Sequence, residues 1–275
     1  MADNDKAVAV IVEENTGTQI ITDRDSFQGD DVKLTYDIEL GPLSPIKYDA
    51  MGPFKFFPFM ECRHSVQSMD HNATGCITIK PKNKPAQVFD FQDARGYIEG
   101  DRGHSFPTKY FWSQCNVWQE QCFRSHFASE VASHTSYAKP SRHWLSVMVS
   151  CAVIPYLGLK FLGTICIVHF NGREIRLATY LGARVKQFTY DKLVITQGWG
   201  KRRKILTVTV LEPEKNVHGL RAPVRGQFSR TIYESVCTPV QYKLTMGKAI
   251  LFDVTGKAAA YEYSEIKNSQ DKIVL

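Results

Sequence analysis

The sequence predicts an all-β protein, and two observations carry this prediction. Branched and aromatic residues recur in short runs with period-2 alternation, which is typical of strands packed on one face. Glycine, asparagine and proline separate these runs at short intervals, as turns require. A helical period occurs at residues 119–137, where Phe123, Phe127 and Val131 recur at four-residue spacing. Many short strands with at most one or two short helices indicate a sandwich or a barrel.

The first third of the chain contains several expected strands. Residues 7–13 and 18–22 predict a hairpin. Residues 32–40 alternate cleanly, and their apolar face, which we expect to point inward, consists of Val32, Leu34, Tyr36, Ile38 and Leu40. Residues 54–60 predict a strand that is broken at Pro58, because proline cannot donate to a central ladder. Further strands are expected at 61–71, 76–80 and 87–91, with a turn at 72–75.

Residues 90–118 mix aromatic, charged and glycine residues more densely than any other stretch. Strand alternation puts one set of side chains on a common face: Phe89, Phe91, Asp93, Arg95, Tyr97, Glu99 and Asp101. Charges among aromatic rings suit neither a dry core nor bare solvent, but they suit the wall of a ligand pocket. A turn at residues 103–107 leads into a second aromatic strand. One face of that strand carries Tyr110, Trp112, Gln114, Asn116 and Trp118.

Strands dominate the second half as well. Lys139 and Pro140 indicate a connection before them, and Asn171 with Gly172 is the strongest short hairpin signal in the chain. The remaining strands are expected at residues 143–152, 160–170, 174–180, 184–188, 192–197, 205–211, 227–235, 241–246, 249–254 and 258–263.

Size and cysteine usage bound the class of protein. The chain has 275 residues, 43% of them hydrophobic, which suffices for one large β domain or two smaller ones. Its 7 cysteines are odd in number and form no CxxC pair, which indicates a reducing compartment. The start is acidic and polar, unlike a signal peptide, and the longest apolar run (residues 154–170) contains Pro155 and Lys160. We therefore predict a cytoplasmic protein.

The charge pattern limits the partners. The net charge is +6, and the densest basic cluster is residues 201–204. The favoured interpretation of this cluster is a solvated hairpin tip, and the alternative is peripheral contact with an anionic membrane surface. Nucleic acid is not expected, because no basic stripe is interleaved with stacking aromatics.

Familiar catalytic motifs are absent. The sequence has no GxxxxGK[ST] loop, no strand–GxGxxG–helix unit and no GxSxG elbow. His64, Asp70 and His71 invite a metal interpretation, but on a strand His64 and Asp70 share a face that His71 does not. No HExxH or paired Cys/His spacing supports a metal. We predict neither a metal nor another cofactor.

Charged residues inside apolar strands form the candidate site, namely Glu61, His64, Asp70, Glu99 and Asp101. One interpretation is a buried, mutually satisfied network in which Arg63 and Arg95 neutralise the carboxylates. The other is an acid that delivers a proton, because desolvation raises the pKa of a carboxyl group held in an apolar pocket. Which acid would stay neutral depends on distances, so both interpretations stay open at the level of sequence.

The same stretch resembles a known family. Residues 96–116, GYIEGDRGHSFPTKYFWSQCN, resemble the tocopherol cyclase signature, in which G-Y-I-E-x-D/N-W-G-x-S-F-P precedes an aromatic run ending W-x-Q-x-N. Other matches follow in family order at Phe59 to Cys62 with His64, Ser68 to His71, Ile154–Pro155 with Leu157–Gly158, Ala178 to Tyr180 with Gly182–Ala183, Ala222–Pro223 with Gly226, and Glu234–Ser235. The resemblance covers about residues 40–265. It implies two lipocalin-like antiparallel β-barrel or sandwich halves, residues 1–139 and 140–275.

The resemblance also implies a reaction. A tocopherol cyclase protonates the trisubstituted alkene of a prenylated hydroquinone, and the phenol oxygen captures the tertiary cation to close a chromanol ring. Such chemistry needs a positioned acid, a dry pocket and aromatic π faces, but no cofactor. The expected acid is Glu99 or Asp101, with His64 and Asp70 as second choices. The expected substrate-binding residues are Arg95, Tyr97, Phe106, Trp112, Gln114, Asn116 and Trp118, with Gln114 or Asn116 orienting the phenol.

Two departures from the family keep a second function open. Arg102 stands where the family has Trp, and no counterpart of a W-Y-F-K-like family segment precedes Ala7, so we expect the first family strands to be missing. Both departures favour a lipocalin-like carrier that holds a hydrophobic prenyl lipid without chemistry. The retained Glu99, Asp101 and aromatic run favour the cyclase, or an isomerase or hydratase-like relative that uses the same protonation.

Overall fold

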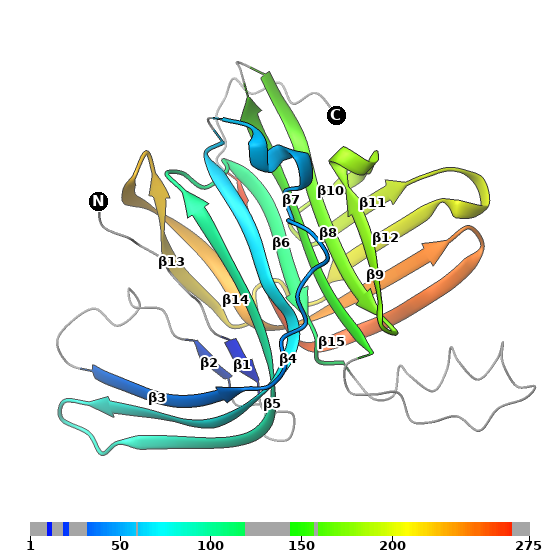
Figure 1. The fold of residues 1–275 in the computed structure, drawn as a ribbon. Helices are drawn as coiled ribbons and strands as arrows, with labels where there is room; N and C mark the ends of the chain where they lie inside the picture. Colours follow the sequence, from blue (N-terminus) through cyan, green and yellow to red (C-terminus); the bar gives the residue numbers. More distant parts are fainter. Residues whose placement is uncertain are drawn as a thin grey trace, which may run out of the picture.

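The computed structural model of the protein is built from antiparallel β-sheets (Figure 1). It describes residues 10–12, 19–21, 32–58, 60–118, 144–156 and 159–265. Within these residues the strands form a five-stranded and a ten-stranded sheet, and the helical segments are short 3₁₀ turns. The predicted all-β class is therefore confirmed. The strand order of each sheet is open and not that of a closed barrel.

The five-stranded sheet has the order β2-β1-β5-β4-β3. Its strands are β1 (Val10–Val12), β2 (Gln19–Ile21), β3 (Val32–Leu40), β4 (Cys62–Pro81) and β5 (Gln87–Gly103). The expected hairpin of residues 7–13 and 18–22 is confirmed where it is described, since β1 and β2 pair antiparallel. The long β4–β5 hairpin connects this sheet to the functional site described below.

Bulges bend the β4–β5 hairpin, and one of them replaces the turn expected at residues 72–75. The pairing register shifts between Ala73 and Gly75, yet β4 continues through both as one strand. Gly75 has φ +154°, and a Cβ there would lie 2.0 Å from the Asp37 carbonyl oxygen. Only glycine fits this backbone and this close approach, so the strand bends without reversing.

The inward face expected for residues 32–40 is wrong in part. Tyr36 is 70% exposed and Leu40 47% exposed, whereas Ile38 packs against a small core that contains Ile77 and Phe91. β3 lies at the edge of its sheet, and the core beneath it is too small to cover every alternate residue.

The ten-stranded sheet contains most of the hydrophobic core. Its path is β10-β11-β12-β14-β15-β6-β7-β8-β9, and β13 pairs with β14 beside that path. Its strands are β6 (Lys109–Cys115), β7 (Leu145–Tyr156), β8 (Leu159–Phe170), β9 (Arg173–Ala178), β10 (Arg184–Phe188), β11 (Lys192–Gln197), β12 (Lys204–Val210), β13 (Val217–Val224), β14 (Gln227–Met246) and β15 (Ala249–Glu265). Fully buried side chains from eight of these strands form one cluster, which includes Phe111, Leu193 and Leu244.

The ten-stranded sheet curls until its two ends approach each other. The Gln197 side chain on β11 donates from Nε2 to the Arg176 carbonyl of β9 (3.2 Å), and its Oε1 accepts from the Ala178 N–H (3.1 Å). One side-chain amide thus takes the place of backbone pairing between β9 and β11.

Several strand predictions in this sheet are confirmed. The bounds of β10 and β11 agree with the expected 184–188 and 192–197. Asn171 and Gly172 form the expected hairpin turn, with φ values of +47° and +73°. The structure corrects three points: residues 227–235 and 241–246 belong to the single strand β14, residues 249–254 and 258–263 belong to the single strand β15, and β13 was not expected.

The strand expected at residues 54–60 is also wrong, because residues 52–56 form the 3₁₀ turn η1 (Gly52–Phe56). Pro53 sits in its first turn, where a missing N–H costs nothing. The Phe54 ring lies 5.8 Å from the Phe161 ring and 6.2 Å from the Tyr180 ring. These contacts fix η1 against β8 and the 3₁₀ turn η2 (Thr179–Leu181).

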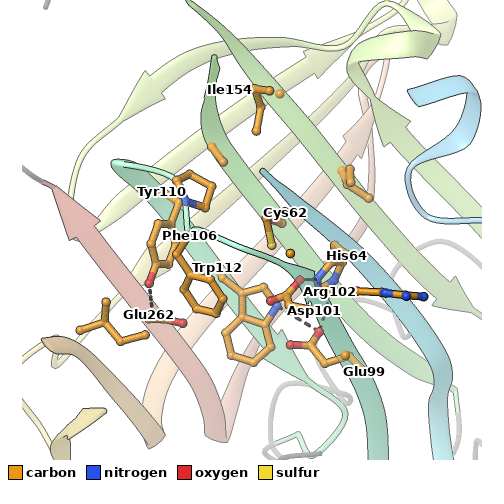
Figure 2. Close-up of a pocket in the computed structure, with 18 of the residues that line it drawn as sticks. Cys62, His64, Glu99, Asp101, Arg102, Phe106, Tyr110, Trp112, Ile154 and Glu262 are labelled. Carbon is orange, nitrogen blue, oxygen red and sulfur yellow. Dashed lines mark hydrogen bonds and ion pairs between the residues drawn. The ribbon is translucent and has the colours of Figure 1, made fainter. Parts of the chain in front are cut away.

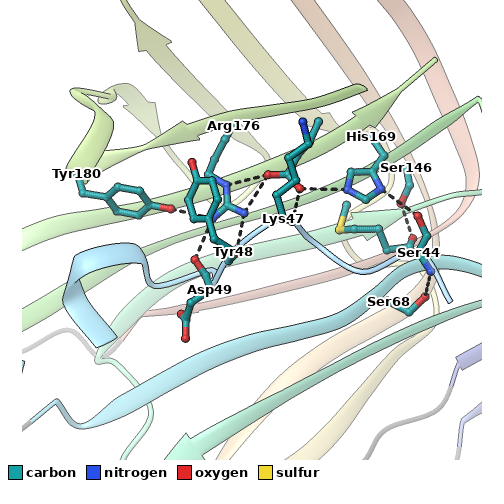
Figure 3. Close-up of polar contacts among 11 residues, drawn as sticks. Ser44, Lys47, Tyr48, Asp49, Ser68, Ser146, His169, Arg176 and Tyr180 are labelled. Atoms are coloured by element: carbon teal, nitrogen blue, oxygen red, sulfur yellow. Dashed lines mark hydrogen bonds and ion pairs between the residues drawn. The ribbon is translucent and has the colours of Figure 1, made fainter. Parts of the chain in front are cut away.

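Buried charges on β9 hold the segment that precedes η1 (Figure 3). Arg176 donates to the carbonyl oxygens of Asp49 and Tyr48, each at 2.9 Å. Glu174 accepts from the Lys47 N–H at 2.8 Å and also binds Arg176. Residues 47–49 are therefore tied through their backbone to one strand of the ten-stranded sheet.

Several expectations concern residues outside the described ranges. These are the helix at 119–137, the connection at Lys139 and Pro140, and Phe59. The boundary between halves at residues 139 and 140 stays a prediction. β6 lies before that boundary, and it pairs with β7 and β15 in the ten-stranded sheet.

The basic cluster of residues 201–204 lies at the tip of the β11–β12 hairpin, around the 3₁₀ turn η3 (Gly200–Arg202). Lys201, Arg202 and Arg203 are exposed, and Trp199 beside them is 87% exposed. In the described part of the chain, no helix combines the length and apolar character needed to cross a membrane.

Candidate active site

A cavity of about 600 Å³ lies between β4–β5 and the strands of the ten-stranded sheet (Figure 2). β6, β7 and β8 form one wall, β13 to β15 contribute another, and Met51 and Phe54 of the η1 region reach it from the side. This volume is that of a site for a small organic molecule. The lining is mostly apolar, but it includes a cluster of titratable side chains, among them His64, Glu99 and Asp101.

His64 on β4 lies between two carboxyl groups of β5. Its Nδ1 is 3.0 Å from Asp101 Oδ1, and its Nε2 is 3.3 Å from Glu99 Oε2. Antiparallel pairing produces this contact, because His64 and Asp101 are direct cross-strand partners. Burial disfavours the charged imidazole, but the carboxylates of Glu99 and Asp101 raise the pKa of His64 to about 9. His64 is therefore a cation at neutral pH.

Glu99 is the most heavily hydrogen-bonded carboxyl group of the cluster. The Tyr97 hydroxyl (2.5 Å) and Trp112 Nε1 (3.2 Å) both donate to the Oε2 atom that faces His64. Burial raises the pKa of Glu99 to about 7, while the charge of His64 and the two donors oppose that rise. Glu99 can therefore gain and lose a proton near neutral pH.

Gln114 on β6 brings an unused donor to the cavity. Its side chain lines the cavity and only 7% of the residue is exposed. Among the described residues its Nε2 has no hydrogen-bond partner. A buried polar group without a partner is costly, so this amide is explained best by a ligand that accepts its hydrogen bond.

Aromatic rings surround the titratable cluster. Alternation along β6 points Tyr110, Trp112 and Gln114 to the cavity, while Phe111 enters the main core. Phe106 also lines the cavity and packs edge-on against Tyr110, with ring centroids 6.1 Å apart. The cavity therefore offers π faces next to its acids.

Four predicted site residues lie outside this cavity. Asp70, Arg95 and Asn116 form a separate buried network, in which Arg95 Nε donates to Asp70 Oδ1 (2.8 Å) and Asn116 Nδ2 donates to the same atom (3.2 Å). Trp118 packs among core residues, and its Nε1 donates to the Leu145 carbonyl (2.7 Å). Asp70 instead borders a smaller cavity of about 260 Å³.

The sequence left open whether the charged residues form a satisfied network or an acid site, and the structure contains both arrangements. Arg95 neutralises Asp70, as the first interpretation requires. Arg63 donates to the Phe57 carbonyl (3.2 Å). His64, Glu99 and Asp101 form the second arrangement, in which the charges meet at a cavity.

Two further carboxyl groups of the cavity were not predicted. Glu234 on β14 and Glu262 on β15 are cross-strand partners, and each is 9% exposed. The Tyr110 hydroxyl donates to Glu262 Oε1. Glu262 interrupts an apolar run, which is the same signal that identified Glu99, whereas Glu234 stands in a more polar part of β14. Both lie far from residues 90–118 in sequence.

Arg102, which stands where the tocopherol cyclase family has Trp, is exposed at the edge of the same cavity. Its cross-strand partner is Arg63. The described residues contain no group of three or more His, Cys, Asp or Glu side chains placed to hold a metal ion. The predicted independence from metals stays a prediction.

Comparison with known proteins supports the resemblance seen in the sequence. The chain is similar to the tocopherol cyclase-like family over residues 20–136. His64, Tyr97, Glu99, Asp101 and Trp112 fall within this part. Glu234 and Glu262 lie outside it.

Among solved structures, the chain is similar to kievitone hydratase from Nectria haematococca. The sequence identity is 10% and the TM-score is 0.43, and the alignment covers 96% of this chain and 70% of that chain. No curated protein matches the chain.

Proposed function

We propose that this protein is a tocopherol cyclase-like enzyme that protonates the alkene of a prenylated hydroquinone or a related prenyl lipid. The observation that carries the proposal is the position of Glu99, a buried carboxyl group that titrates near neutral pH at a largely apolar cavity. The family similarity over residues 20–136 supports this class of reaction.

Glu99 is proposed as the proton donor. Its carboxyl O–H bond breaks, and the proton forms a C–H bond at the less substituted alkene carbon, which leaves a tertiary cation. The new carboxylate is stabilised at once by His64, Tyr97 and Trp112, because all three already face Oε2. Such preorganised donors lower the barrier without rearrangement during the reaction.

The surroundings of Glu99 suit the cation as well. The Trp112 ring is held by its hydrogen bond to Glu99, and an aromatic face stabilises a nearby positive charge. The mostly apolar lining disfavours water, which would otherwise capture the cation. The free amide of Gln114 is proposed to donate to an oxygen of the hydroquinone and thereby fix the phenol beside the alkene.

Asp101 is proposed to position His64. It accepts from His64 Nδ1, so the other imidazole nitrogen faces Glu99. Asp101 also lines the cavity, but its carboxylate is held by the imidazole of His64.

The test compares the wild type with Glu99→Gln and Asp101→Asn on a prenylated hydroquinone whose side chain carries a trisubstituted alkene. Loss of general acid catalysis costs about 10²- to 10⁴-fold, so Glu99→Gln should lose at least that much turnover while it still binds the quinol. Asp101→Asn should lose less. If both variants stay within about threefold of an active wild type, the acid lies elsewhere.

The second candidate function is a carrier that holds a prenyl lipid without chemistry. Arg102 favours it, because a guanidinium replaces the family's Trp at the edge of the cavity. Mass spectrometry of lipids extracted from the purified protein would identify the molecule bound in the cavity, whether the protein is a cyclase or a carrier. A bound prenyl lipid together with complete inactivity of the wild type would favour the carrier over the cyclase.

A further inference from the structure

The cavity contains a second buried acid group, which the proposed reaction above does not use. Glu234 and Glu262 face each other across β14 and β15, and both side chains line the cavity. Like charges directly opposite each other destabilise a sheet. Two mostly buried carboxyl groups in this relation are expected to hold one proton between them.

The surroundings of Glu262 favour the same state. The groups that face it are Tyr110 on β6, Glu234 on β14, and Glu99 and Asp101 on β5. Burial raises the pKa of Glu262 well above its usual range, and the charge of Glu234 raises it further, while the hydrogen bond from Tyr110 opposes the rise.

Three more titratable groups border this site. Arg230 lies beside the Tyr110 ring, 6.0 Å from its centroid, and is engaged with the Pro107 carbonyl at 3.0 Å. Cys62 on β4 also lies near Glu262, and burial raises the pKa of its thiol well above the usual range. His218 on β13 is the direct cross-strand partner of Glu234 and is exposed to solvent.

An independent observation indicates that a ligand reaches this site. The unpartnered Nε2 of Gln114 belongs to β6, the strand that pairs with β15. On that strand Trp112 is the direct cross-strand partner of Glu262, and Gln114 lies two residues further on the same face. A phenol that accepts from Gln114 would therefore lie beside Glu262.

Figure 2 shows the Trp112 ring between Glu262 on one side and Glu99 on the other. The two acid groups thus face one cavity from either side of an aromatic ring. A cyclisation that adds a proton to an alkene and removes one from a phenol can use one of these groups for each proton transfer.

We propose that the Glu234–Glu262 pair holds one proton and that its remaining carboxylate takes the phenol proton as the ring closes. This inference rests on the proposed function. The phenol oxygen forms a C–O bond to the cation, its O–H bond breaks, and the proton passes to the pair. Glu99 has given one proton and the pair has received one, so the overall reaction is an isomerisation.

The first measurement is independent of turnover. Infrared spectroscopy at about pH 8.5, where Glu99 has lost its proton, should show a carboxylic acid C=O band that shifts in D₂O. Glu262→Gln should abolish it, whereas Glu234→Gln should shift its frequency, because it replaces the neighbouring carboxyl group by an amide while Glu262 stays buried. The control variant Glu265→Gln changes a carboxyl group on the same strand that binds Lys109 outside the cavity, and it should retain the band. A wild type without the band, or a band unchanged in both variants, would overturn the shared proton.

The second measurement is the product ratio. In Glu262→Gln and Glu234→Gln the cation still forms, so the chromanol should fall by about 10²-fold relative to the shifted alkene and the tertiary alcohol. Glu99→Gln should lower all products together. A purely structural role for the pair would lower all products in constant ratio, and that result would overturn the assignment as proton acceptor.

The two proposals fail in different ways. A wild type that yields no product refutes the cyclase, and the infrared band still decides whether the pair holds a proton. Normal chromanol formation by both glutamine variants refutes the role of the pair and leaves the cyclase intact.

Discussion

The charge state of His64 makes the folded protein less stable as the pH rises, and this prediction can be worked out from the structure. The pKa of His64 is raised from an ordinary value of 6.5 to about 9. A histidine with a raised pKa contributes stability that is fully present below pH 6.5 and is lost as the pH rises through about 9. We therefore expect the free energy of unfolding to decrease as the pH rises from about 6.5 to about 9.

The size of the effect follows from the same two values. A pKa difference of one unit corresponds to about 1.4 kcal/mol, so the change from 6.5 to about 9 gives at most about 3 kcal/mol. Asp101 is 34% exposed at its side chain, and solvent screens part of its attraction. A loss of about 1 to 2 kcal/mol is the realistic expectation.

The assay is urea unfolding of the wild type and His64→Gln at about pH 6.5 and 9. Groups far from His64 titrate alike in both proteins, so the difference between the two pH dependences reports His64 together with Glu99, whose pKa the charge of His64 lowers. An imidazole titration followed by NMR should give the raised pKa directly. Equal pH dependence in both proteins would refute the charged triad of His64, Glu99 and Asp101.

Three more predictions test the interpretation of neighbouring residues. Arg95→Met should cost about 3 to 5 kcal/mol of unfolding free energy, because it leaves the buried carboxylate of Asp70 without its guanidinium; a near-neutral result in thermal unfolding would contradict that account. Arg102→Trp should change stability by less than about 1 kcal/mol, because Arg102 is exposed, while it alters affinity for prenylated aromatics in a ligand titration; a collapse of thermal stability would show a structural role instead. Elemental analysis of protein purified without added metal should find no stoichiometric zinc or iron, and a stoichiometric metal would refute the predicted independence from metals.

The sequence predicts the site best where the backbone is regular. Between residues 97 and 101 the expected face of β5 is kept, so Tyr97, Glu99 and Asp101 share the cavity, whereas Arg95 of the same predicted face turns to Asp70. At Asp93 the alternation fails, because φ is +60° and the register shifts nearby. Phe91 and Ala94 then enter the same core cluster, although period 2 puts them on opposite faces.

The remaining residues of the site come together through pairing between strands that are distant in sequence, and no local sequence pattern predicts that pairing. β6 lies between β15 and β7, and this neighbourhood brings Glu262 to Trp112 across the sheet. A sequence analysis centred on residues 90–118 names Trp112 but has no means to find its partner 150 residues later. The position of Asp70 could not be predicted from a local pattern either. Asp70 and His64 lie on the same strand, but bulges in β4 between them turn the Asp70 side chain toward Arg95.

These bulges explain why the protein contains two charged clusters of opposite character on one hairpin. Regular pairing would leave His64 and Asp70 on one face of β4, since they are six residues apart. The register shifts between Val66 and Ser68 and between Ser68 and His71 remove that relation. Asp70 then meets a guanidinium and is neutralised, whereas His64 meets two carboxyl groups beside a cavity. At the cavity two carboxyl groups face one imidazole, and burial together with the second carboxyl group raises the pKa of Glu99 so that Glu99 can hold a proton. A site that transfers a proton needs such a carboxyl group more than it needs a balanced ion pair.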